Sequence, residues 1–94
     1  MATLTELINR ASAEAGDMQG TPQQIAWAET LADGRTTELL EALRALQKAG
    51  EPQLAALVKR AMRIIRINRA AWWIEHRTQT TSYLLLDEFD ANLQ

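Results

Sequence analysis

The chain has 94 residues and a net charge of −2 at pH 7, with 47% of its residues apolar and 23% charged. This length supports one domain with a single modest core, and the composition lies far from that of intrinsically disordered chains. The absence of cysteine excludes disulfides and thiolate chemistry and fits a reducing compartment. No apolar run approaches the roughly 20 residues of a membrane helix, and the first ten residues lack the pattern of a signal peptide. We therefore expect a cytoplasmic protein that does not bind membranes.

Alanine, leucine, glutamate, glutamine and arginine are frequent, whereas the chain has two prolines and four glycines, so an all-α fold is expected. The first helix is predicted within residues 3–16, with a helical apolar spacing and Gly16 at its end. Thr21 is a good N-cap for the second helix, Pro22 suits its first position, and Gln24 completes a capping box. We favour one long helix over residues 22–49, with Gly34 as the place for a kink, over two helices that are separated there.

The clearest amphipathic pattern falls within residues 52–68, where aliphatic side chains occupy one face and basic side chains the other. This helix is expected to end near Asn68, which would cap a short helix within residues 69–77. In the tail, Leu86, Phe89 and Leu93 have helical spacing, so a last helix is predicted. The expected architecture is a single domain over residues 1–94, an all-α bundle of four to five helices.

The reactive side chains argue against an enzyme. His76 is the single histidine and cysteine is absent, so neither a Ser-His-Asp triad nor a four-ligand zinc site is indicated. Asp87, Glu88 and Asp90 form an acidic cluster without the spacing of a calcium loop, and a solvated tail is its simplest interpretation. We predict no catalytic residue, no metal and no cofactor.

Basic side chains concentrate in residues 59–77, which carry six cationic groups and one carboxylate, whereas the rest of the chain carries four cations and eleven carboxylates. No acidic residue lies three or four positions away within the basic helix itself, so the basic face is expected to be unpaired and to point outward. It is either a solvated face partly paired with the protein's own acids, a site for an acidic protein partner, or a site for nucleic-acid phosphates. The candidate partner-binding residues are Lys59, Arg60, Arg63, Arg66, Arg69 and Trp73.

The three tryptophans allow two interpretations. We expect Trp27 and Trp72 to share the core, with Trp73 covered by Arg69 and Arg77, which lie four residues before and after it. The alternative is a surface patch of aromatic and arginine side chains, the residue types enriched in interface anchors.

Two short stretches together resemble a known domain. Gly20, Thr21, Gln24, Trp27 and Ala28 match the pattern Gly-Ser/Thr-x-Lys-Gln-apolar-x-Trp-Ala. In the stretch 70–77, Ile74 and Arg77 match an apolar-Ile-Asp-Asn-Arg ending. Small domains with this pair of motifs occur in bacterial and phage proteins, among them an anti-CRISPR protein that acts on type I-E systems. The chain departs from the pattern by Gln23 in place of lysine and by Glu75-His76 in place of Asp-Asn.

The resemblance implies a shared fold in which Trp27 meets the 70–77 segment and Arg77 reaches a carbonyl or acidic group at that junction. It also implies an inhibitor of a bacterial defence system, encoded by a phage or mobile element and acting in the cytoplasm of the bacterial host. Such a protein would bind a protein component of a type I CRISPR-Cas complex. Two alternatives stay open, a nucleic-acid-binding accessory domain that uses the basic helix 53–67 and a scaffold module of a larger bacterial complex.

Overall fold

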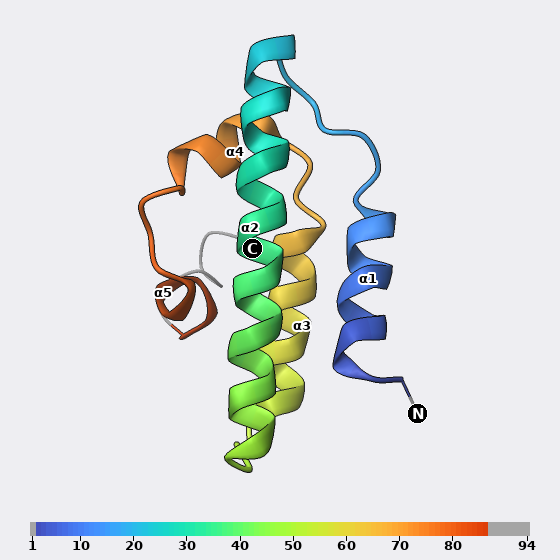
Figure 1. Ribbon diagram of the computed structural model, residues 1–94, viewed down its shortest axis with the longest axis vertical. Helices are drawn as coiled ribbons and strands as arrows, with labels where there is room; N and C mark the ends of the chain where they lie inside the picture. The colour runs from blue at the N-terminus through green and yellow to red at the C-terminus, as the bar shows by residue number, and fades with distance from the viewer. Residues whose placement is uncertain (1, 87–94) are drawn as a thin grey trace.

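The computed structural model describes residues 2–86, which form five helices in a single small bundle (Figure 1). Helix α2, Pro22–Lys48, lies at the centre with α1, Leu4–Glu14, on one side of it and α4, Ala70–Glu75, with α5, Thr81–Leu86, on the other. Helix α3, Leu54–Ile65, packs against both α1 and α2. The all-α prediction is confirmed. The predicted continuation of the last helix through Phe89 and Leu93 lies outside the described residues, as do Asp87, Glu88 and Asp90.

The start of α2 is set by the capping box expected from the sequence. The Thr21 hydroxyl accepts a hydrogen bond from the Gln24 backbone N–H at 3.2 Å, and the Gln24 side chain accepts one from the Thr21 N–H at 3.1 Å. Pro22 occupies the first turn, where its missing N–H has no intrahelical partner to lose. The helix then runs without a break through Gly34, which confirms one long helix. Its 27 residues make it about 40 Å long, close to the longest dimension of the molecule, 41 Å.

The core gathers the apolar faces of all five helices. Helix α3 contributes most because its apolar side chains occupy one face, as expected. The buried residues are Leu4, Ile8, Ala11, Ala28, Leu39, Leu43, Leu57, Val58, Ala61, Ile64, Ile65, Ala70, Trp72, Trp73, Leu84 and Leu85. No polar or charged residue is buried in the described part of the chain, so the core needs no internal polar network.

Two loops that are far apart in the sequence hold the start of α2 against the start of α4. Gln19 donates its backbone N–H to the Asn68 carbonyl at 2.6 Å, and the Ala70 N–H donates to the Gln19 carbonyl at 2.8 Å. Gly20 follows with φ +152°, and a Cβ atom built on it would lie 2.9 Å from the Ala70 Cβ. A side chain at position 20 would therefore separate the two loops.

The connection between α3 and α4 differs from the prediction that Asn68 caps the following helix. The N-cap of α4 is Arg69, without a capping side chain. The Asn68 side chain instead donates to the Ala15 carbonyl at 3.1 Å, just beyond the end of α1. The Asn68 side chain therefore makes a tertiary hydrogen bond to the end of α1 and does not cap its own neighbouring helix.

Candidate interaction surface

Trp27 is the large apolar side chain that the described part of the structure leaves exposed, at 48% of its full surface. It extends from the first turns of α2, next to the buried Ala28. The guanidinium carbon of Arg77 lies 5.1 Å from the centroid of its ring, a geometry in which a cation is attracted to the indole face. Arg77 is held there by a hydrogen bond that it donates to the Ile74 carbonyl at 2.5 Å.

This arrangement partly confirms and partly corrects what the sequence predicts. The predicted contact between Trp27 and the 70–77 segment is present, and Arg77 reaches a carbonyl, as expected. The predicted burial of Trp27 is wrong because its ring lies at the surface beneath an arginine.

Trp73 is only 3% exposed, so the prediction that arginine side chains cover it at the surface is wrong. Its indole N–H donates to the Ile67 carbonyl at 2.8 Å, which satisfies the one polar group that the ring brings into the core. Trp72 is also buried, and the two rings meet edge to face with centroids 5.1 Å apart. The arginine contact predicted for Trp73 is made by Trp27 instead.

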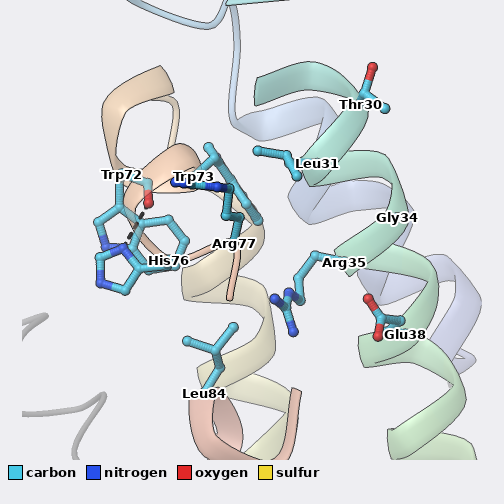
Figure 2. A pocket seen from close by; sticks show the side chains of 10 residues that line it. All are labelled: Thr30, Leu31, Gly34, Arg35, Glu38, Trp72, Trp73, His76, Arg77 and Leu84. Atoms are coloured by element: carbon cyan, nitrogen blue, oxygen red, sulfur yellow. Dashed lines mark hydrogen bonds between the residues drawn. The ribbon is translucent and has the colours of Figure 1, made fainter. Parts of the chain in front are cut away.

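A pocket of about 180 Å³ lies beside Trp27 and Arg77, between α2 and the α4–α5 segment (Figure 2). Side chains from α2 form one wall, side chains from α4 form the other, and Leu84 of α5 closes one end. The lining residues are Thr30, Leu31, Gly34, Arg35, Glu38, Trp72, Trp73, His76, Arg77 and Leu84.

Arg35 points from α2 into this pocket and joins its two sides (Figure 2). Its guanidinium donates to the Thr81 hydroxyl at 3.0 Å and to the Gln79 carbonyl at 2.6 Å. These bonds tie α2 to the loop after α4 and to the first residue of α5, and they hold the guanidinium in one orientation. Residue spacing alone does not indicate Arg35, since its partners lie more than 40 positions away in the sequence.

His76 also lines the pocket, and Figure 2 shows its ring stacked on the indole of Trp72. The ring centroids are 4.1 Å apart, and Nδ1 is 2.7 Å from the Trp72 carbonyl oxygen. A carbonyl oxygen only accepts, so Nδ1 carries the proton and Nε2 is the acceptor in the neutral ring. Both contacts fix the orientation of the His76 ring.

The predicted partner-binding residues occupy different environments. Lys59, Arg63, Arg66 and Arg69 are exposed, and Lys59, Arg60 and Arg63 line a shallow pocket on α3. Arg60, however, is half-buried and donates to the Leu85 carbonyl at 2.6 Å. Arg66 forms an ion pair with Glu14 of α1 at 2.7 Å, so the expectation of an unpaired basic face is wrong. Trp73 lies in the core, apart from this face.

The pairing of Arg66 follows from tertiary packing. Helix α1 packs alongside α3, and this brings Glu14 to Arg66 from outside the basic helix. Of the three interpretations of the basic face, the one in which it is partly paired with the protein's own acidic residues therefore applies at this end of α3.

Comparison of the chain with protein-family models, with curated proteins and with solved structures found no match. Between residues 2 and 86 there is no helix with the length and apolar character needed to cross a membrane. Over the same range, no three histidine, cysteine or carboxylate side chains come together as metal ligands would.

Proposed function

We propose that this protein acts by binding another protein and that it inhibits a bacterial defence system, a type I CRISPR-Cas complex. In this proposal it is encoded by a phage or mobile element, and it acts without catalysis by covering a surface on one protein component of the complex. The observation that carries the proposal is the exposed Trp27 beside Arg77, next to a pocket. The paired-motif resemblance directs the proposal to defence systems.

An exposed tryptophan of this kind supports binding for an energetic reason. Burial of apolar surface stabilises an interface by about 25 cal/mol per Å², and indole rings offer a large apolar area at a small cost in side-chain entropy. Tryptophan and arginine are both enriched among the residues that dominate binding energy. Trp27 and Arg77 are also held by their contact with each other and by the bond from Arg77 to the Ile74 carbonyl, so binding would cost little conformational entropy.

The contacts of the basic helix weigh against the alternative of nucleic-acid binding. Arg66, at the end of α3, is paired with Glu14, and Arg60 donates to a backbone carbonyl, so both of these cations already have partners within the protein. Nucleic-acid binding through this face would have to compete with these contacts, and it would weaken steeply with added salt.

The proposal is tested by a phage-plating assay in bacteria with active type I CRISPR immunity against that phage. Expression of the protein is expected to raise the plating efficiency of the targeted phage toward that seen in a strain without the matching spacer. The variant Leu43→Asp, which places a charge in the core, serves as an unfolded control and should give no protection. Unchanged immunity in the presence of the folded protein would contradict the proposed function.

A further inference from the structure

The surface formed by Trp27, Arg77 and the adjacent pocket, here called the Trp27–Arg77 face, carries two arginines, Arg35 and Arg77. Arg35 is bonded to a hydroxyl and a carbonyl, and Arg77 to a carbonyl and an indole face. Among residues 2–86, neither guanidinium forms an ion pair with a carboxylate. These partners of both guanidinium groups within the described structure are thus neutral, and the one carboxylate in the pocket wall is that of Glu38.

The size of the pocket selects the kind of group that it can accept. At about 180 Å³, it is smaller than the roughly 300–1,000 Å³ typical of sites for cofactors and drug-sized ligands. It is close to a cavity of about 150 Å³ that accepts a benzene ring. One apolar side chain of a protein partner therefore fits, with Leu31, Trp73 and Leu84 among the residues that line its walls.

Charge distinguishes the two ends of the face. Glu38 lines the pocket eleven residues after Trp27 on α2, which places it about 16 Å further along the helix axis. A negative group on a partner is therefore favoured at the Arg77 end and disfavoured at the Glu38 end.

We infer that the Trp27–Arg77 face docks a segment of a protein partner that inserts one apolar side chain into the pocket and places a carboxylate against Arg77. Trp27 packs beside this carboxylate and excludes water from its contact with the guanidinium. Polynucleotides fit this face less well, because Glu38 lines the same pocket and would repel a phosphate chain. The identity of the partner rests on the proposed function, whereas the chemistry of docking does not.

The docking chemistry is tested without any defence component. A library of random peptides displayed on phage is selected on the immobilised full chain, and the enriched peptides are synthesised. They are expected to share an Asp or Glu beside a Leu, Ile or Phe and to lose at least tenfold in affinity for Trp27→Ala and for Arg77→Glu. Arg10→Glu is the matched charge control, since Arg10 is exposed on α1 and α1 lies across α2 from α4 (Figure 1).

A charge exchange makes this test specific. Replacing the peptide carboxylate by lysine should abolish binding to the unaltered protein and restore it to the Arg77→Glu variant. The inference would be overturned if the enriched peptides contained no carboxylate. It would also be overturned if they bound Trp27→Ala and Arg77→Glu as tightly as the unaltered chain. Trp27-dependent self-association in sedimentation, or Trp27-dependent binding of a single-stranded RNA oligonucleotide with no acidic peptide enriched, would also overturn it.

The same variants separate this inference from the proposed function. If the unaltered protein restores phage plating and Trp27→Ala and Arg77→Glu do not, the defence component docks on this face. If both variants restore plating fully, the inhibitor acts through another surface and the inference is wrong for that partner. If the unaltered protein fails in the plating assay, the proposed function is wrong, and the peptide experiment still decides the docking chemistry. Circular dichroism should show the same helical content and thermal midpoint for all the variants.

Discussion

At the scale of single residues, Gly20 decides how closely the starts of α2 and α4 approach. Gly20→Ala would bring a Cβ to 2.9 Å from the Ala70 Cβ at a φ of +152°, so we expect the free energy of unfolding to fall by about 1–3 kcal/mol in urea titrations. Gly16→Ala is the control, because Gly16 has a φ of +71° but nothing within 4 Å of an added Cβ. Equal losses in the two variants would show that the close contact with Ala70 contributes nothing.

At the scale of the helix, α2 contains a glycine where packing requires none. An added Cβ at Gly34 meets nothing within 4 Å, so Gly34→Ala should raise the free energy of unfolding by about 1 kcal/mol through helix propensity alone. Thr21→Ala should lower it by about 1 kcal/mol, because the Gln24 N–H at the start of the helix loses its acceptor. Thermal unfolding followed by circular dichroism measures both changes. No gain from Gly34→Ala would mean that α2 is not continuous through this position in solution.

At the scale of the whole molecule, the ion pair between Arg66 and Glu14 links α3 to α1. Its side chains are 42% and 48% exposed, so Glu14→Gln should lower the free energy of unfolding by no more than about 1 kcal/mol. The loss should shrink at high salt because mobile ions screen exposed charges. The control variant Glu41→Gln, at an exposed position on α2, should change the free energy of unfolding little at either low or high salt. A loss from Glu14→Gln that is independent of salt would contradict an electrostatic origin.

The sequence by itself determined the local features of this protein. The all-α class, the capping box at Thr21, the long second helix and the apolar face of α3 all follow from interactions between residues within one or two helical turns. The spacing of residues along the chain encodes such interactions, so they can be predicted without a structure. The contact between the motifs around Trp27 and Arg77 was also predicted, through the resemblance.

Only the tertiary structure decided which side of each helix meets which neighbour. The spacing of Trp72 and Trp73 gives the angle between them but not the rotation of α4 about its axis, and that rotation is set by the backbone bonds between Gln19 and residues 68–70. Both rings consequently turn into the core, while Trp27 is left at the surface under Arg77. Arg66 meets Glu14, 52 positions away, for the same reason. Contacts between distant segments depend on how the helices pack, and no short-range pattern in the chain records that packing.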